Sequence, residues 1–382
     1  MACPALSSER SDATGAWIMK AAVLNANEGR FDIEDVRIDV PKGREVLVDV
    51  KACGLCHSDL HLAEANFGTP LPAVLGHELA GVVKQVGPDV RELKVGDHVV
   101  GSLVQFCGHC VSCLSGRTYQ CENPNETMRA AEHGHRLTRT SDGQPVYTGW
   151  GTAAFAEQTL VHENQLVKVP DAVPFPQASI LGCGVITGAG AAINTADLKP
   201  GETAVVIGVG GVGLNVIAGA KLAGADRIIA IDTQPQKEEL ARKFGATDFI
   251  NAMEGDAVAA VKAILPRGVD HAFEVIGLTP TTEQAIQMVR SGGSVYLIGL
   301  HRPGQTFSLA GLDVIVRQID LKGVFMGSSN IKRDIPMFAD LYLQGRFNLD
   351  DLVAREVNIS EINEAYEDLK HGAIARSVIT SF

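Results

Sequence analysis

A strand, a glycine-rich turn and an apolar helix follow one another at residues 203–223, and this segment constrains the fold more than any other. Residues 204–213 read AVVIGVGGVG, and further short apolar runs follow at residues 227–231, 248–251, 271–275 and 294–298. Helical patterns separate these runs at residues 235–244, 256–264 and 280–290. Parallel strands need such crossover helices, so the alternation predicts an α/β fold with a doubly wound parallel sheet.

The glycine spacing within this segment predicts a dinucleotide site. Gly208, Gly210 and Gly213 form the string GxGxxG directly after the strand, and Asp232 closes the next strand 19 residues after Gly213. In this Rossmann arrangement the glycines allow a tight turn, close approach of the pyrophosphate and close packing of helix on strand. Asp232 would bind the adenosine ribose and repel a 2′-phosphate, which favours NAD over NADP. Lys237 is near enough in sequence to contact the ribose, although its position suits a solvated helix lysine almost as well.

Four cysteines stand close together in the first half of the chain. Cys107, Cys110, Cys113 and Cys121 have the spacing C-x2-C-x2-C-x7-C. Four thiolates so close in sequence can surround one tetrahedral ion without help from the rest of the fold. An iron–sulfur cluster also uses four cysteines, but zinc is preferred. A site closed by four sulfurs has no open position, so its role would be structural.

A second set of metal-ligating residues is scattered along the chain. Cys56 lies in GLCHSDLH (54–61), His77 in GHELAG (76–81) and Cys183 in GCGVITG (182–188). Taken singly, the cysteines suit small buried side chains and His77 suits a core histidine. Together they have the composition of a catalytic zinc site with three protein ligands and one open position.

With these motifs in this order, the sequence from about Met19 to Phe382 resembles the zinc-dependent alcohol dehydrogenases of the medium-chain dehydrogenase/reductase family. The resemblance implies a mostly β, GroES-like catalytic domain at residues 19–185 and 328–382, interrupted by an NAD-binding Rossmann domain at 186–327. Residues 1–18 would be a disordered extension. The loop of about 29 residues between Cys121 and Gly151 resembles that of dimeric members, so a homodimer is expected, with a homotetramer as the alternative.

The resemblance also implies a role for individual residues. Cys56, His77 and Cys183 would bind the catalytic zinc, with Glu78 behind the metal or as a transient ligand and Asp59 orienting the histidine. Ser58 and His61 would relay the alcohol proton, and Phe67 and Leu103 would form the wall of the substrate pocket. The residues expected to hold the dinucleotide are His57, Thr187, Gly208, Gly210, Gly211, Val212, Gly213, Asp232, Lys237 and Arg376.

The expected function is hydride transfer between NAD and a primary alcohol or aldehyde with an apolar or aromatic tail, with two zinc ions per chain. Three alternatives stay open: a glutathione-dependent formaldehyde dehydrogenase-like enzyme, a nicotinoprotein that keeps NAD bound through turnover, and an inactive zinc-ribbon interaction protein. The presence of Cys183 as third ligand counts against the polyol dehydrogenase branch of the family.

The charge and hydropathy of the sequence limit the kinds of partner and the location that we expect for the protein. The net charge is −12, which argues against nucleic acid as a partner. The uncharged run at residues 203–220 is long enough for a membrane span, but its five glycines and its opening strand pattern favour the nucleotide loop. The polar N-terminus lacks the apolar core of a signal peptide, so we expect a cytoplasmic protein.

In the C-terminal stretch, helices are expected at residues 335–343 and 360–370, the latter capped by Ser360.

Overall fold

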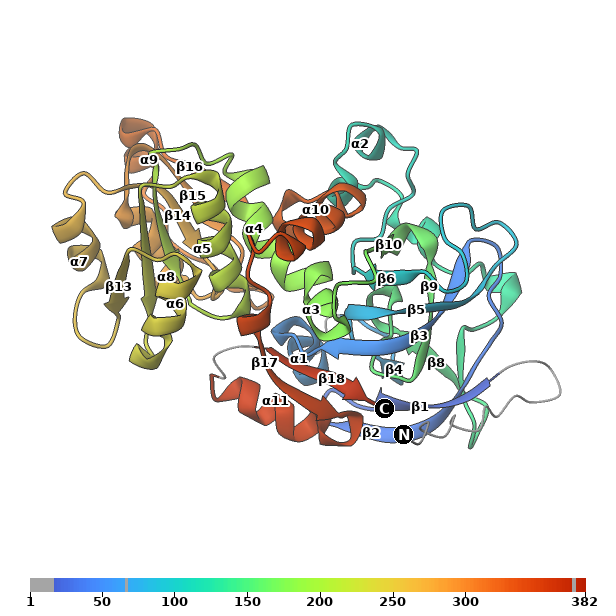
Figure 1. Ribbon diagram of the computed structural model, residues 1–382. Helices are drawn as coiled ribbons and strands as arrows, with labels where there is room; N and C mark the ends of the chain where they lie inside the picture. The colour runs from blue at the N-terminus through green and yellow to red at the C-terminus, as the bar shows by residue number, and fades with distance from the viewer. Residues whose placement is uncertain (1–16, 66–67, 373–375) are drawn as a thin grey trace.

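The computed structural model describes residues 17–65, 68–372 and 376–382. Figure 1 shows two bodies side by side, one rich in β-strands and one with helices on both faces of a sheet. The second body contains the predicted parallel sheet, whose strand order is β13-β12-β11-β14-β15-β16. These strands span Thr203–Ile207 (β11), Arg227–Asp232 (β12), Asp248–Asn251 (β13), Val269–Glu274 (β14), Val289–Leu297 (β15) and Asp320–Gly323 (β16).

The helices of this body connect the parallel strands as crossovers. They are α5 (Gly211–Ala223), α6 (Glu238–Phe244), α7 (Ala257–Ile264), α8 (Thr279–Met288) and α9 (Gly311–Arg317). The sheet order places β11 between β12 and β14, so the chain reverses direction across the sheet next to the glycine turn. Two details differ from expectation: β15 begins at Val289, before the expected residue 294, and β16 is a sixth strand that the sequence pattern did not indicate.

The first body combines a closed barrel and a larger sheet. The barrel order is β1-β2-β7-β8-β4, and the sheet order is β10-β6-β5-β3-β18-β17, with β9 also paired to β3. The strands are β1 (Trp17–Leu24), β2 (Phe31–Ile38), β3 (Glu45–Gly54), β4 (Ala73–Val74), β5 (Glu78–Val86), β6 (His98–Gly101), β7 (Leu137–Arg139), β8 (Pro145–Thr148), β9 (Gln158–His162), β10 (Leu166–Lys168), β17 (Val353–Asn358) and β18 (Arg376–Ser381). Its helices are α1 (His57–Glu64), α2 (Val111–Leu114), α3 (Phe175–Ile180), α10 (Ile331–Leu343) and α11 (Ile362–Lys370).

The C-terminal segment returns to this first body. Strand β18 pairs with β3, where Val378 lies opposite Gly54 and Ile379 opposite Cys53. The expected extension 1–18 is wrong at its end, because β1 already begins at Trp17, where it pairs with Ile38. Residues 1–16 lie outside the described part of the chain.

An apolar helical stretch, Phe175–Thr195, joins the two bodies. It contains α3, α4 (Ile186–Gly190) and two π-helical turns. By length and composition it is the described helix that could cross a membrane, but 78% of its apolar window is buried inside the protein, as in a core helix. Val100, Ile186 and Val206 belong to one buried cluster, so the core runs from the β-sheet through this stretch to the nucleotide sheet.

The caps of the last helices differ from expectation. Asn358, not Ser360, is the capping residue: its side chain accepts a hydrogen bond from the Ser360 N–H, and the Glu361 side chain accepts one from the Asn358 N–H. Helix α10 begins at Ile331, capped by Asn330, rather than at residue 335.

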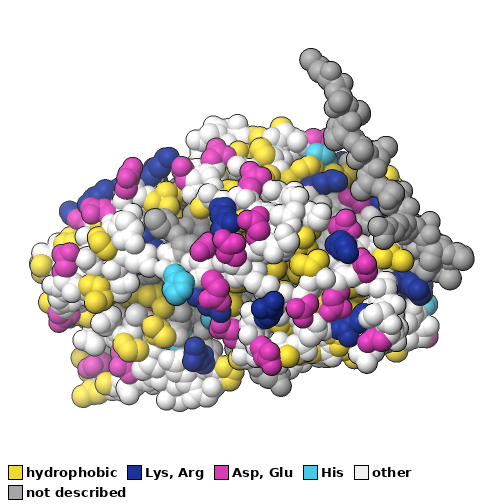
Figure 2. Space-filling view, turned by 90° about the horizontal axis from the view of Figure 1, so that it is seen from below, with side chains coloured by type: hydrophobic (Ala, Val, Ile, Leu, Met, Phe, Trp, Pro, Cys, Tyr) yellow, Lys and Arg dark blue, Asp and Glu magenta, His cyan; other side chains and the backbone are white. Residues whose placement is uncertain are grey.

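Acidic and basic side chains are interspersed over the face of the molecule seen in Figure 2.

Candidate active site

The three scattered metal-ligating residues meet at the end of β3. Cys56 precedes α1, His77 precedes β5, and Cys183 lies in the π-helical turn Leu181–Val185. His77 Nε2 lies 3.3 Å from Cys183 Sγ. Ligand atoms of Cys56, His77, Glu78 and Cys183 all lie within 4.8 Å of one another, and all four residues are buried. Two thiols and an imidazole this close can hold one zinc ion and leave one position open.

A buried carboxylate fixes the orientation of His77. Asp59 Oδ2 lies 2.9 Å from His77 Nδ1, and Asp59 Oδ1 accepts a hydrogen bond from the Gly76 N–H at 3.1 Å. Burial alone would lower the pKa of His77, but Asp59 raises it well above its usual range. With the proton held on Nδ1, the Nε2 lone pair faces the thiols, which is the orientation that a metal-binding histidine needs.

The donor set also favours a thiolate. A hydrogen bond with Cys183 lowers the pKa of Cys56 well below its usual range, and the Arg376 guanidinium, 3.6 Å from Cys56 Sγ, lowers it further. Thiolate sulfur and neutral imidazole are ligands that zinc prefers. The residues therefore fit the metal that their chemistry implies.

The four-cysteine ladder, Cys107, Cys110, Cys113 and Cys121, forms a second cluster in the lobe that carries α2 (Figure 1). All four thiols are free, and Cys107 Sγ lies 3.9 Å from Cys113 Sγ. Backbone N–H groups point at the sulfurs: Cys110 N–H donates to Cys107 Sγ at 3.4 Å and Cys113 N–H to Cys110 Sγ at 3.5 Å. Such donors stabilise thiolates, and the ladder sulfurs also lie within 4.8 Å of one another. The expected cluster is thus assembled by its own backbone.

Comparisons with known proteins agree with this geometry. Residues 42–171 match the alcohol dehydrogenase GroES-like domain, and residues 211–343 match the zinc-binding dehydrogenase family. The chain is 37% identical over 367 residues to alcohol dehydrogenase class-3 of Drosophila melanogaster, covering 94% of this chain and 97% of the relative. The chain belongs to the zinc-dependent medium-chain alcohol dehydrogenases.

Two further relatives have narrower names. The chain is 36% identical over 364 residues to geraniol dehydrogenase of Castellaniella defragrans, covering 94% of this chain and 97% of the relative. The crystal structure of benzyl alcohol dehydrogenase from Acinetobacter calcoaceticus superposes with a TM-score of 0.89 at 36% identity, covering 96% of this chain and 99% of that one. The fold expected from the sequence is therefore confirmed, and the protein is an oxidoreductase.

The nucleotide loop of this alcohol dehydrogenase has the expected shape. Gly208 has a φ of 101°, and a side chain at Gly213 would lie 1.9 Å from the Gly208 carbonyl oxygen. No atom of the described residues lies within 4 Å of where a Cβ would stand at Gly210, which leaves room for a phosphate. Asp232 Oδ2 accepts a hydrogen bond from the Val209 N–H at 2.8 Å, so the acid at the end of β12 braces the loop.

Lys237 pairs with this acid. Its Nζ lies 3.1 Å from Asp232 Oδ2, and both side chains are 9% exposed. The reading of Lys237 as a solvated helix lysine is therefore wrong, because its ammonium group is buried against a carboxylate. The positive charge of Lys237 also offsets part of the repulsion that Asp232 alone would exert on a 2′-phosphate.

Glu78 and Arg376 connect the metal ligands to the nucleotide loop. Arg376 Nη2 lies 3.1 Å from Glu78 Oε1, and a Cβ at Gly211 would lie 3.1 Å from Arg376 Nε. Burial raises the pKa of Glu78 to about 7. Arg376 thus lies beside the loop, as a phosphate-binding arginine requires, while its guanidinium is bound to Glu78 and the Leu55 carbonyl.

The remaining expected residues surround the same centre. Ser58 Oγ lies 3.7 Å from Cys56 Sγ, and His61 follows one turn later on α1. Thr187 lies in α4, and a Cβ at the adjacent Gly188 would lie 2.3 Å from the Val212 carbonyl oxygen, so α4 packs on the start of α5. His57 is exposed at the start of α1.

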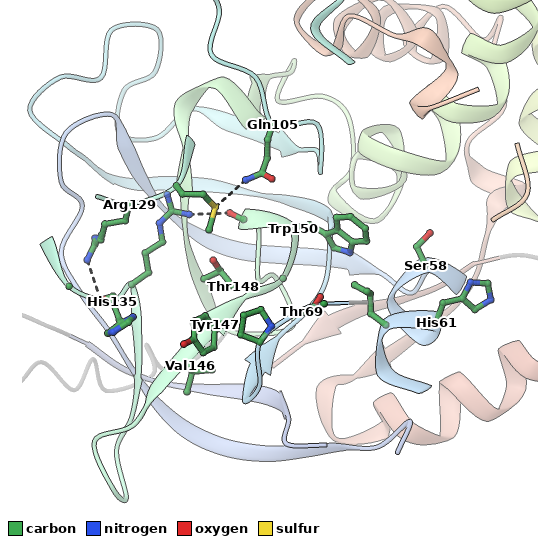
Figure 3. Close-up of a pocket in the computed structure, with 18 of the residues that line it drawn as sticks. Ser58, His61, Thr69, Gln105, Arg129, His135, Val146, Tyr147, Thr148 and Trp150 are labelled. Carbon is green, nitrogen blue, oxygen red and sulfur yellow. Dashed lines mark hydrogen bonds between the residues drawn. The ribbon is translucent and has the colours of Figure 1, made fainter. Parts of the chain in front are cut away.

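A cavity of about 640 Å³ opens beside Ser58 and His61 (Figure 3). Its lining includes Gln105, Met128, Tyr147, Trp150 and Leu300. Leu103 is not among the described residues that line it; its side chain belongs to the buried cluster that also contains Cys56 and Cys183. Phe67, the other expected wall residue, lies outside the described residues.

Sequence reasoning missed most of this wall. Trp150 is one of only two tryptophans in the chain and stands between two glycines, which is the one signal that could have drawn attention to it. Met128 and Tyr147 come from the long segment after the ladder and carry no pattern of their own.

Proposed function

We propose that this alcohol dehydrogenase oxidises primary alcohols with an apolar or aromatic tail, and reduces the matching aldehydes, with NAD. The observation that supports this is the cavity beside Ser58 and His61, whose lining includes the apolar and aromatic side chains of Met128, Val146, Tyr147, Trp150 and Leu300. These side chains can bind the apolar tail of a substrate, while its hydroxyl group would lie at the metal end of the cavity.

The zinc held by Cys56, His77 and Cys183 would supply Lewis acidity, which lowers the pKa of an alcohol hydroxyl. Ser58 Oγ, close to Cys56 Sγ, would accept the hydroxyl proton while giving up its own, which would pass by way of a ribose hydroxyl of the bound NAD to His61 and from there to solvent. Asp59 keeps His77 in the metal-binding orientation. Thr187 and Val212 would hold the nicotinamide from the α4 and α5 sides.

The cofactor proposal can be tested at Asp232. Kinetics with NAD and NADP, on the native enzyme and on Asp232→Ala, should show a preference for NAD that falls at least about tenfold in the variant, because a charge-assisted hydrogen bond to the ribose is lost. Lys237→Ala serves as the companion, since it leaves the acid in place and should strengthen the preference. A native enzyme that prefers NADP would overturn the proposal.

Substrate choice can be tested with a panel of benzyl alcohol, hexanol, ethanol and S-(hydroxymethyl)glutathione. The first two should give the highest kcat/KM. Arg129 and Arg136 line the cavity, but both guanidinium groups are bound to Glu45, and Arg129 also to Asp39. They are thereby neutralised, which disfavours a substrate with free carboxylates. Rapid turnover of the glutathione adduct alone would favour the formaldehyde dehydrogenase alternative. In a separate assay, release of NAD from the purified protein on denaturation would favour the nicotinoprotein alternative.

We also propose two zinc ions per chain, with the second, structural ion in the ladder. Metal analysis of the purified enzyme should give two zincs, whereas one zinc and no activity would favour the zinc-ribbon alternative.

The free thiols of both clusters suit a reducing compartment, so we place the enzyme in the cytoplasm, which fractionation would test.

A homodimer is proposed from the outer edge of the nucleotide body. Leu312, Ile315 and Val316 of α9 are 71%, 74% and 71% exposed. Strand β16, which follows, is the edge strand of its sheet. Apolar side chains beside a free sheet edge fit a second copy of the chain. Sedimentation should give a dimer that Ile315→Glu converts to monomer; a native monomer would contradict this, and a tetramer would require a further interface.

A further inference from the structure

Trp150 has a backbone conformation that is unusual for its residue type. Its φ is 56° and its ψ is 10°, in the left-handed region, and it stands between Gly149 and Gly151. A bulky residue adopts this conformation only when its surroundings enforce it, and such residues cluster at functional sites.

The surroundings of this turn are fixed by buried side chains. Gln165 Nε2 donates to the Trp150 carbonyl oxygen at 3.0 Å, and Arg136 Nη1 donates to the Gly151 carbonyl oxygen at 3.4 Å. Arg136 is in turn held by Glu45 Oε1 at 2.7 Å. The backbone that follows the ring is thus bound by buried side chains of the β body.

The flanking glycines leave the turn no room to shift. A Cβ at Gly149 would lie 2.5 Å from Leu75 Cδ2, and one at Gly151 would lie 2.8 Å from Gln165 Oε1. Both flanking positions therefore suit glycine, and the turn packs closely against Leu75 and Gln165.

The indole ring lies between the metal ligands and the cavity. Its centroid is 6.2 Å from that of the His77 ring, with an interplanar angle of 69°, and the residue lines the cavity. Figure 3 shows Trp150 among the lining residues on the side that leads to Ser58. Its Nε1 atom is buried and has no hydrogen-bond partner among the described residues, so what the ring offers the cavity is an aromatic surface.

We propose that Trp150 is the residue that determines substrate specificity, because an aromatic or conjugated tail stacks on its indole ring while the hydroxyl group points to the end of the cavity near His77. This inference rests on the proposed substrate class and deepens it. The neighbouring Gln105 does not compete as a polar anchor, since its amide donates to Thr127 Oγ1 at 2.9 Å and lies 3.2 Å from Met128 Sδ.

The test compares kcat/KM for benzyl alcohol and for hexanol in the native enzyme, Trp150→Leu and Trp150→Phe. In Trp150→Leu the benzyl-to-hexanol ratio should fall about 5- to 10-fold, because the stacking of two aromatic rings is lost while apolar volume is retained. Trp150→Phe should restore most of the ratio. An unchanged ratio in a folded Trp150→Leu, verified by circular dichroism, would overturn the proposal.

A binding measurement separates this proposal from the proposed function. The chain has two tryptophans, so Trp17→Phe, a change in β1, leaves Trp150 as the single tryptophan, whose fluorescence can be excited selectively at the red edge of the absorption band. Benzyl alcohol should then change the fluorescence at saturable concentrations, and hexanol should change it less. If the fluorescence changes but the native enzyme oxidises no aromatic alcohol, the proposed substrate class is wrong and the contact with the ring is retained. If aromatic alcohols are oxidised without any change in fluorescence, the proposed role of Trp150 is wrong.

Discussion

The two clusters of metal-ligating residues use similar atoms in opposite ways. The ladder takes all four sulfurs from residues 107–121, whereas the active-site set takes its ligands from residues 56, 77 and 183. In the ladder the nearest partners of the sulfurs are N–H groups of the same loop. In the active-site set the ligands contact side chains from other parts of the chain: His77 pairs with Asp59, and Cys56 lies beside Arg376.

This difference separates what each site can do. A loop that surrounds an ion with its own sulfurs gains stability but has no position left for a substrate. Ligands brought together by β3, β5 and the stretch Phe175–Thr195 depend on the folded body, which holds three of them rigidly and leaves the fourth position open. We therefore propose that catalysis belongs to the distributed cluster, and the predictions below test this division.

The largest effect is expected for Cys183→Ala. Loss of one of three ligands should remove the active-site zinc and lower kcat at least about 1,000-fold, because Lewis-acid stabilisation is worth several kcal/mol. The zinc content should fall from two to one, and the thermal midpoint should change little. Loss of both ions, or a variant that keeps its activity, would contradict the independence of the clusters.

Cys113→Ser should have the opposite profile. Losing the ladder ion should destabilise the protein by at least about 4 kcal/mol, which corresponds to a drop of roughly 5 °C in the thermal midpoint. Activity per folded molecule at low temperature should be largely retained. Cys53→Ala is the matched control, since Cys53 is buried but belongs to neither cluster, and its substitution should keep both zincs. Equal zinc loss in both variants would refute the assignment.

A histidine–carboxylate pair lies at each cluster, Asp59–His77 at the active site and His109–Glu126 beside the ladder, and substitutions in the two pairs should differ in effect. Asp59 and His77 are fully buried, whereas His109 and Glu126, 2.7 Å apart, are 64% and 50% exposed in their side chains. Asp59→Asn should reduce zinc affinity or kcat/KM by about 10- to 100-fold, because the histidine loses its orienting partner. Glu126→Gln should leave both unchanged within twofold, since exposed ion pairs contribute little. Similar losses in the two variants would contradict this ranking.

The same contrast explains what the sequence could reveal. The ladder and the glycine loop could be predicted from spacing, because all their parts lie in one short segment. The ligand set Cys56, His77 and Cys183 has no common period, so only resemblance to a family connected its members. Strand β16 escaped detection because its four residues are all exposed and show no apolar alternation.

Other errors have equally local causes. Asn358 and Ser360 are both good capping residues two positions apart, and only the backbone geometry, with the Asn358 side chain accepting from Ser360 N–H, decides between them. Leu103 was expected in the pocket wall, but it is not among the described residues that line the cavity. The conformation of Trp150 is imposed by Gln165 and Arg136. Both residues lie far from Trp150 in the sequence, so a rule based on neighbouring residues cannot predict this conformation.

The smallest predicted effect concerns the base of the ladder and its response to acid. His162 Nδ1 accepts a hydrogen bond from the Asn164 N–H at 3.1 Å, and the Asn164 side chain donates to the Phe106 carbonyl oxygen at 2.7 Å. Burial, with the nearby Arg44, lowers the pKa of His162 from 6.5 to about 4. The unfolded chain therefore binds the extra proton first, and the contribution of His162 to stability, complete above pH 6.5, decreases as the pH falls towards 4.

In His162→Gln this acid sensitivity should be absent. At pH 7.5 the variant should be less stable than the native enzyme by about 1 kcal/mol, through the weakened hydrogen bond to Asn164. At pH 5.5 the difference should shrink by roughly 1 kcal/mol, since one proton contributes at most about 1.4 kcal/mol per pH unit. Urea midpoints at both pH values, with zinc in excess, measure this. His133→Gln, at an exposed loop position, controls for the loss of an imidazole as such. A difference that grows on acidification would mean that His162 stabilises the ladder base as a cation, and that this cluster, like the active-site set, depends on charged partners beyond its own loop.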